Sequence, residues 1–182
     1  MNLQPTIDFV TNAHAGQFRK GIPLPYIVHP FAVLYEIAIW GVQCEDCWKA
    51  ALSHDILEEN AKISVDELKN VIGEKATNIV QELTFLPEQG DKRKYMESFL
   101  VKSPAAIVIK MSDRICNTAD FLDTLPAKDL SYAGKYWNKA ESLFVAALSR
   151  RDEIVQCFGT EVWARMRFKQ NKINQRILEE VV

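Results

Sequence analysis

The sequence lacks the long apolar segment that a membrane-spanning helix requires. No run within its 182 residues approaches the roughly 20 consecutive apolar residues that cross a bilayer. The first residues, Met1 to Thr6, also lack a basic stretch followed by an apolar core, so they do not resemble a secretory signal. We therefore expect a cytoplasmic protein with no membrane partner.

The chain also lacks a strong excess of charge of either sign. Its 22 Lys and Arg residues are nearly balanced by 24 Asp and Glu residues, for a net charge of −2. Proteins that bind nucleic acid through its phosphate backbone present a basic face. The balance therefore argues against a nucleic-acid partner, but it is compatible with a small anionic ligand held by a few local Lys and Arg residues.

Cysteine is scarce, with four residues in the chain. Cys44 and Cys47 form a single C-x-x-C pair, whereas Cys116 and Cys157 stand alone. A structural zinc site usually shows a second pair or spaced histidines, and a thioredoxin-like redox site needs a βαβ context. Neither accompanies this pair, so we expect reduced, partly buried thiols.

Repeats, low-complexity segments and linkers long enough to divide the chain are absent. With 48% hydrophobic and 25% charged residues, the composition is that of a globular domain. Helical periodicity dominates, and the alternating patterns of strands are scarce. We predict an all-α, orthogonal helical bundle in which residues 1–182 form one domain and helices from 131–182 pack on the rest.

Helix boundaries follow from Pro, Gly and capping signals. Pro30 suits the first turn of a helix that Gly41 ends, and Ser64 with Glu67 forms a capping box at the start of another helix. The predicted helices are 6–19, 30–40, 45–60, 64–73, 74–84, 92–101, 104–125, 131–158 and 163–178.

Two carboxylates fall on apolar faces of the predicted helices. Asp55 lies on the apolar stripe of the helix 45–60, and Asp113 lies on the stripe of the helix that Pro104 opens. A buried carboxylate is costly unless it is paired or binds a cation. Both positions therefore require a partner.

One cation could satisfy both acids. His54 precedes Asp55, and His29 stands just before Pro30. Together with Asp113 these residues offer imidazole nitrogen and carboxylate oxygen, a set that suits Mn²⁺, Fe²⁺ or Zn²⁺. Alternatively, the acids pair with Arg or Lys and the histidines are core residues, since buried ion pairs show the same pattern.

Glu58 and Glu59 follow His54 and Asp55 at a spacing of four residues, which places them one turn further along the same face. A metal-activated water needs an acid–base group nearby, and a departing phosphate oxygen needs a proton. The alternative is that both are solvated carboxylates before a turn.

Four blocks in a fixed order carry a resemblance to a known family. They are AHAGQFRK at 13–20, PYIVHP at 25–30, ALSHDILEE at 51–59 and KMSDRICN at 110–117. Over about residues 5–150 the chain resembles the HD superfamily of phosphohydrolases, and within it the hydrolase domain of the RelA/SpoT homologues. Because 182 residues leave no room for the synthetase and regulatory domains of the long homologues, we expect the small alarmone hydrolase type.

The resemblance implies an HD-domain bundle that hydrolyses the 3′-pyrophosphate of a nucleotide alarmone such as (p)ppGpp or (p)ppApp. Pyrophosphate and a nucleoside 5′-phosphate would be released. The metal would be Mn²⁺ or another divalent transition ion, with the implied ligands His29, His54, Asp55 and Asp113. Glu58 and Glu59 would serve hydrolysis. The implied substrate contacts are Arg19, Lys20, Asn117 and Tyr136.

The match departs from the family at one functional position. The family usually has Glu-Asp where this chain has Glu58-Glu59, and the extra methylene moves a carboxylate by about a bond length, enough to change a rate. Three alternatives therefore stay open: an HD nucleotidase, an NADPH 2′-phosphatase and a degenerate HD module that binds a nucleotide without turnover. The basic run 92–94 could steer a polyphosphate or form a solvated helix face.

Overall fold

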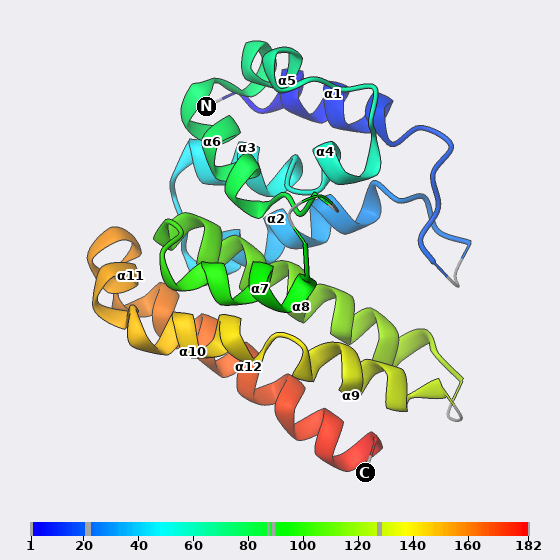
Figure 1. The fold of residues 1–182 in the computed structure, drawn as a ribbon, viewed down its shortest axis with the longest axis vertical. Helices are drawn as coiled ribbons and strands as arrows, with labels where there is room; N and C mark the ends of the chain where they lie inside the picture. The colour runs from blue at the N-terminus through cyan, green and yellow to red at the C-terminus, as the bar shows by residue number, and fades with distance from the viewer. Residues whose placement is uncertain (1, 21–22, 87, 89, 127–128, 182) are drawn as a thin grey trace.

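The computed structural model describes residues 2–20, 23–86, 88, 90–126 and 129–181, and its regular elements are helices (Figure 1). Among the described residues the β-structure is one isolated antiparallel bridge between Phe18 and Pro25. The predicted all-α bundle is confirmed. Within the described part of the chain, no helix combines the length and apolar character that a membrane span needs.

The helices form two groups that meet at α2 and α8 (Figure 1). Helix α2 packs against α3, α8 and α12, so it lies at the centre of the bundle. The first group comprises α1 (Gln4–Ala13), α2 (Val28–Trp40), α3 (Glu45–Leu52), α4 (Ile56–Glu59), α5 (Val65–Ile72) and α6 (Glu74–Leu83). The second comprises α7 (Lys92–Glu97), the 3₁₀ helix η2 (Ser98–Leu100), α8 (Pro104–Thr124), α9 (Ser131–Asn138), α10 (Glu141–Ser149), α11 (Arg151–Phe158) and α12 (Thr160–Glu180).

The capping signals identify helix ends correctly. Ser64 Oγ accepts a hydrogen bond from the Glu67 backbone N–H, and the Glu67 carboxylate accepts one from the Ser64 N–H, as a capping box requires. Gly41 ends α2 in the left-handed conformation, with φ of 104°, which a residue with a Cβ rarely adopts. Pro104 occupies the first turn of α8 behind the N-cap Ser103.

Two predicted helices are shorter than periodicity suggested. The helix predicted for 6–19 ends at Ala13, and a turn follows. In this turn His14 Nδ1 and Gln17 Oε1 are hydrogen-bonded at 2.7 Å. The helix predicted for 45–60 breaks at residues 53–55, where Ser53 and Asp55 have φ near −110°. No Gly or Pro marks this second break. It turns His54 and Asp55 toward α2 and α8.

The helix predicted for 131–158 is three helices, α9, α10 and α11. The breaks at Ala140 and Arg150 contain neither Gly nor Pro. All three segments contact α8, and the breaks let α10 pack in addition against η2 and α7, and α11 against α12. Tertiary packing overrides local periodicity here.

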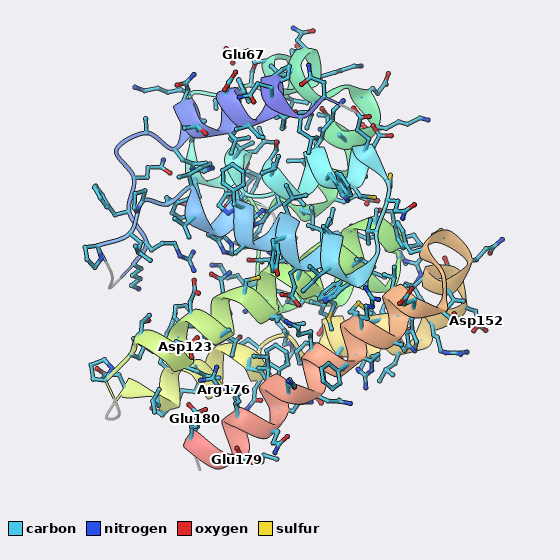
Figure 2. The ribbon with its side chains drawn as sticks, turned by 180° about the vertical axis from the view of Figure 1, so that it is seen from behind. Glu67, Asp123, Asp152, Arg176, Glu179 and Glu180 are labelled. Atoms are coloured by element: carbon cyan, nitrogen blue, oxygen red, sulfur yellow. The ribbon has the colours of Figure 1, made fainter. Side chains whose placement is uncertain are left out.

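The C-terminal helix α12 lies along α8 on the back of the molecule (Figure 2). Its apolar side contributes Val162, Met166 and Ile173 to the core. Near its end, Arg176 Nη2 lies 2.8 Å from Asp123 Oδ1 at the end of α8. Helix α8, which carries Asp113, is therefore supported from behind along its length.

Candidate active site

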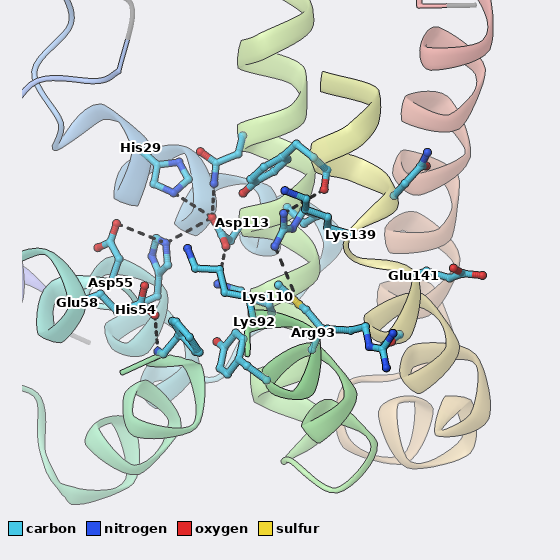
Figure 3. Close-up of a pocket in the computed structure, with 18 of the residues that line it drawn as sticks. His29, His54, Asp55, Glu58, Lys92, Arg93, Lys110, Asp113, Lys139 and Glu141 are labelled. Carbon is cyan, nitrogen blue, oxygen red and sulfur yellow. Dashed lines mark hydrogen bonds and ion pairs between the residues drawn. The ribbon is translucent and has the colours of Figure 1, made fainter. Parts of the chain in front are cut away.

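The four residues that the sequence offers as metal ligands come from three separate segments and meet in the bundle (Figure 3). His29 lies in the first turn of α2, His54 and Asp55 lie in the break between α3 and α4, and Asp113 lies in the middle of α8. All four are buried, with exposed fractions between 2% and 8%. The expectation that both aspartates lie inside the protein is confirmed.

The geometry of three of these residues suits a cation. Ligand atoms of His29, His54 and Asp55 all lie within 4.8 Å of one another. Asp113 Oδ1 lies 3.1 Å from His29 Nε2 and 3.7 Å from His54 Nε2. A divalent transition ion accepts such a mixed set of nitrogen and oxygen ligands.

Unsatisfied polar atoms support the same fit. His54 Nε2 and Asp55 Oδ1 are buried and form no hydrogen bond among the described residues. Buried polar atoms are nearly always hydrogen-bonded, so an exception needs an explanation such as a ligand or an ion. A cation among these atoms would provide it.

Both carboxylates are held ionised. Burial opposes the charge on Asp55, but His54 and His14 outweigh it and lower its pKa far below the ordinary value. Burial likewise opposes the charge on Asp113, but Lys110 and the two nearby histidines hold its pKa well below the usual range. An ionised carboxylate is the form that binds metal.

Lys110 is a partner of Asp113 that was not predicted from the sequence. Its Nζ lies 2.9 Å from Asp113 Oδ2, while Oδ1 of the same carboxylate faces the histidines. Lys110 precedes Asp113 by three residues, so helical spacing was a signal for this pair. The alternative to a metal site was that the buried acids pair with Arg or Lys. Such a pair is present at Oδ2 of Asp113, and Oδ1 remains on the side of the histidines.

Tyr26 and His14 hold the carboxylate of Asp55 from the side of α1. Tyr26 Oη donates a hydrogen bond to Oδ2 at 2.6 Å, and His14 Nε2 lies 3.5 Å from Oδ1. The two rings stack with centroids 4.8 Å apart. Both residues lie in the family blocks at 13–20 and 25–30, and both position the carboxylate of Asp55.

Glu58 and Glu59 lie in the short helix α4, directly after the metal-ligand candidates, and both line the same cavity. The Glu58 carboxylate accepts a hydrogen bond from the Phe85 N–H at 2.5 Å, which fixes its position. The surrounding protein removes part of its hydration and raises the pKa of Glu58 above the ordinary value. The Glu59 backbone carbonyl accepts a hydrogen bond from Gln17.

The cavity has a volume of about 600 Å³. The acids and histidines lie on one side together with Lys110, and Figure 3 shows Arg93 and Lys139 on the other, where Glu141 also lines the cavity. Lys92 lines it as well. A ligand that fills it would contact both the candidate metal ligands and a basic wall.

Arg114 lines the same cavity and is buried. Among the described residues it forms no ion pair, and its Nε has no hydrogen-bond partner. Its guanidinium lies 4.0 Å from the centroid of the Tyr136 ring and donates to the Tyr136 carbonyl at 3.2 Å. A buried guanidinium without a counter-charge is suited to bind an anionic ligand.

The residues expected to contact substrate divide into two pairs. Asn117 and Tyr136 line the cavity, and Asn117 Nδ2 donates to Asp113 Oδ1 at 2.5 Å. Arg19 and Lys20 are not among its lining residues. Arg19 Nη2 instead donates to Asn117 Oδ1 at 2.7 Å and to Asp120 Oδ2 at 2.8 Å, and Lys20 is exposed.

The helical bundle with a His-Asp pair in the break between two helices defines an HD-type domain. No family model matches the chain. The guanosine-3′,5′-bis(diphosphate) 3′-pyrophosphohydrolase of Aquifex aeolicus is 31% identical over 121 residues, 63% of this chain and 17% of that protein. The enzyme MESH1 of Xenopus tropicalis, named for the same activity, is 31% identical over 124 residues, 65% of this chain and 69% of that protein.

Mouse MESH1 is also 31% identical, over 62% of this chain and 65% of its own length. A solved structure of a metazoan orthologue of SpoT, described as hydrolysing ppGpp, superposes with a TM-score of 0.70 over 96% of this chain and 94% of that one, at 23% identity. The chain belongs to the family of HD-type small alarmone hydrolases. Its alignments span 17% and 65% of the first two relatives' lengths.

Proposed function

We propose that this protein is a metal-dependent phosphohydrolase that removes the 3′-pyrophosphate of a nucleotide alarmone such as (p)ppGpp or (p)ppApp. The products are pyrophosphate and a nucleoside 5′-phosphate. One observation supports this function above others: ionised aspartates, histidines and Glu58 line one side of a cavity whose other side carries Lys92, Arg93 and Lys139. Such a cavity suits a nucleotide with phosphate groups at both ends. The family's named activities support the same substrate class.

His29, His54, Asp55 and Asp113 would hold the metal, which we propose to be Mn²⁺. A divalent ion bound there would lower the pKa of a water molecule and offset phosphate charge. The protein keeps these ligands in place through contacts outside the set. Tyr26 orients Asp55, and Lys110 fixes the second oxygen of Asp113.

Glu58 is suited to move protons during hydrolysis. Its carboxylate is fixed by the Phe85 N–H, and its raised pKa brings it closer to neutrality, where an acid–base group is most effective. We assign Glu58 the transfer of a proton between the attacking water and the departing 3′-oxygen. Glu59, on the same short helix, would orient the water.

Substrate binding uses the other walls of the cavity. Arg114, Arg93 and Lys139 would neutralise phosphate oxygens, and Tyr136 and Asn117 would contact the nucleoside. Arg19 would act indirectly, because its guanidinium holds the side-chain amide of Asn117 in position. Lys20 would approach the ligand from the exposed loop. The substrate is a soluble nucleotide, and we propose the cytoplasm as the place of action.

The test is product analysis. The purified protein is incubated with Mn²⁺ and, in parallel, with ppGpp, ppApp, NADPH and ordinary nucleotides, and the products are separated by anion-exchange chromatography. We expect pyrophosphate and the 5′-phosphorylated nucleoside in equal amounts from an alarmone, only when metal is present. Single phosphate would indicate a nucleotidase or an NADPH phosphatase. Binding of an alarmone without turnover would indicate a degenerate module.

A further inference from the structure

Arg114 is a buried cation that no acid of the protein neutralises. Its exposed fraction is 6%, and among the residues that the structure describes it forms no ion pair with a carboxylate. Lys110, which lines the same cavity, differs in this respect, because its ammonium is paired with Asp113 at 2.9 Å. An uncompensated buried charge destabilises a fold. The position of Arg114 therefore requires an explanation.

The guanidinium of Arg114 has more hydrogen-bond donors than the protein has acceptors for them. Every nitrogen of the group donates and none accepts. The acceptors among the described residues are the Tyr136 carbonyl, 3.2 Å from Nη1, and the Met96 sulfur, 4.0 Å from Nη2, while Nε has no partner. The Tyr136 ring, with its centroid 4.0 Å from the guanidinium carbon, holds the plane in place. Donors without acceptors thus remain in a side chain of fixed orientation.

The segment that follows Tyr136 adds polar groups that the protein leaves unused. Asn138, Lys139 and Ser142 line the same cavity, and their side chains form no hydrogen bond or ion pair with any described residue. Lys139 lies on the side of the cavity opposite the candidate metal ligands (Figure 3). The acid on this side is the exposed Glu141, and Figure 3 shows its side chain extending away from Lys139.

We propose that Arg114, with Asn138, Lys139 and Ser142, forms a subsite for the 5′-phosphate groups of the nucleotide. This assignment rests on the proposed function. A substrate that is hydrolysed at its 3′ end places that end against the candidate metal ligands, so its 5′-phosphates are the anionic group available to the opposite side. The planar fork of a guanidinium matches two oxygens of one phosphate. The subsite therefore selects nucleotides that are phosphorylated at both ends.

The missing counter-charge also predicts how the stability of the protein responds. A bound phosphate supplies negative charge and acceptors, so it should raise the melting temperature even without metal. Arg114→Met removes the charge and keeps most of the apolar stem. The variant without ligand should therefore melt no lower than wild type. A clear fall in its melting temperature would show that the protein itself satisfies Arg114, and would overturn the premise of the subsite.

The first experiment measures the binding of inorganic pyrophosphate to the metal-free protein by calorimetric titration. Without metal, the ionised Asp55 and Asp113 repel the anion, so binding reports on the opposite side of the cavity. Arg114→Met should lower the affinity about 10–100-fold, as for the loss of hydrogen bonds to a charged group. Arg114→Lys keeps the charge without the fork and should recover only part of the affinity.

Lys139→Met is the matched control, because it removes the same charge from an exposed position of the same cavity. It should lower the affinity for pyrophosphate at most about five-fold. Equal losses in Arg114→Met and Lys139→Met would indicate diffuse attraction by the basic wall. Either that result or an unchanged affinity in Arg114→Met would overturn the subsite.

The second experiment identifies the end of the nucleotide that the subsite holds. It compares kcat/KM for ppGpp with kcat/KM for guanosine 3′-diphosphate, which has the same reacting group and no 5′-phosphate. Wild type should prefer ppGpp by about ten-fold or more, and Arg114→Met should lose this preference through lower activity on ppGpp alone. An equal loss on both substrates would overturn the assignment to the 5′ end. If wild type hydrolyses neither compound, the proposed function fails, whereas pyrophosphate binding still decides whether the subsite exists.

Discussion

Tyr26 donates a hydrogen bond from Oη to Oδ2 of Asp55 at 2.6 Å, and this contact connects the segment before α2 with the break between α3 and α4. Burial and the negative charge of Asp55 raise the pKa of Tyr26 far above its ordinary value. The hydroxyl is therefore protonated, and can donate, at neutral pH. It orients Oδ2 of Asp55, which also lies 3.7 Å from His54 Nε2, while Oδ1 faces His14 Nε2 at 3.5 Å.

Removing this hydroxyl should weaken metal binding. Residues that orient metal ligands typically contribute about 10–100-fold to affinity, so we expect Tyr26→Phe to raise the Kd for Mn²⁺ by that factor while the fold is retained. Calorimetric titration with Mn²⁺ measures it. Tyr35→Phe is the matched control, because Tyr35 is 65% exposed. Equal affinities in both variants would show that the hydroxyl does not position Asp55.

Asp113→Asn tests the α8 ligand and exposes a second effect. We expect metal content to fall sharply, because a neutral amide is a weaker ligand than a carboxylate. The substitution also leaves Lys110 buried without its counter-charge, and breaking a buried pair costs about 3–5 kcal/mol. The melting temperature should therefore fall as well.

The double variant Asp113→Asn/Lys110→Met separates the two effects. Lys110→Met removes the uncompensated ammonium and keeps most of the apolar stem. We expect the double variant to regain thermal stability but not metal content, as measured by thermal melting and elemental analysis. Wild-type metal content in the double variant would remove Asp113 from the ligand set.

Glu58→Gln separates chemistry from binding. The amide oxygen can still accept the hydrogen bond from Phe85, so the geometry is retained while the titrating group is lost. General acid–base groups contribute typically about 10²–10⁴-fold, and we expect a loss of kcat in this range with unchanged metal occupancy. Glu59→Gln is the neighbouring control and should lose less. Near wild-type turnover in Glu58→Gln would exclude Glu58 from proton transfer.

The raised pKa of Glu58 also predicts a pH dependence of stability. Its charged form is disfavoured in the folded protein, so the unfolded chain releases this proton more readily, and ionised Glu58 destabilises the fold. Glu58→Gln should therefore melt at a higher temperature than wild type at neutral pH. The difference should vanish as the pH falls below the ordinary value of 4.5, where both states hold the proton. Melting curves at several pH values measure it, and a constant difference would contradict the assignment.

The sequence predicted the parts of the fold that local chemistry determines. The capping box at Ser64, the left-handed end at Gly41 and the start at Pro104 each depend on the backbone preferences of one or two residues. The breaks at 53–55, at Ala140 and at Arg150 have no such signal. They arise because successive segments pack against different neighbours, which depends on residues far away in the chain.

The same limit applies to the candidate site. Asp55 and Asp113 could be recognised because a charge on an apolar stripe needs a partner. The partners themselves could be found only where spacing is local, as for Lys110 and Asp113. Arg19 contacts Asn117, 98 residues away, and Asp120, 101 residues away. Helical periodicity contains no information about such contacts, so the resemblance alone placed Arg19 near the nucleotide.

The last prediction separates direct from indirect contacts with the nucleotide, and compares Lys139 with Arg19. Lys139 lines the basic side of the cavity and has no ion-pair partner among the described residues. Lys139→Ala should raise KM for the alarmone by up to about five-fold, with little change in kcat or melting temperature, because an exposed charge contributes at most about 1 kcal/mol. The effect should diminish at high salt, since salt screens charges that face solvent. Lys75→Ala, which changes an exposed residue of α6 outside the cavity, is the charge-matched control.

Arg19→Ala should behave differently. Arg19 holds the Asn117 amide and pairs with Asp120, so its loss frees a residue of the cavity wall. Hydrogen bonds to charged groups contribute about 1.5–3 kcal/mol, and we expect both a raised KM and a lower melting temperature, with little dependence on salt. Arg19→Lys should not restore either property, because an ammonium lacks the fork that reaches both partners. If the effect of Arg19→Ala on KM depends on salt and the melting temperature is unchanged, the conclusion is different. Arg19 then leaves Asn117 and contacts the phosphates directly.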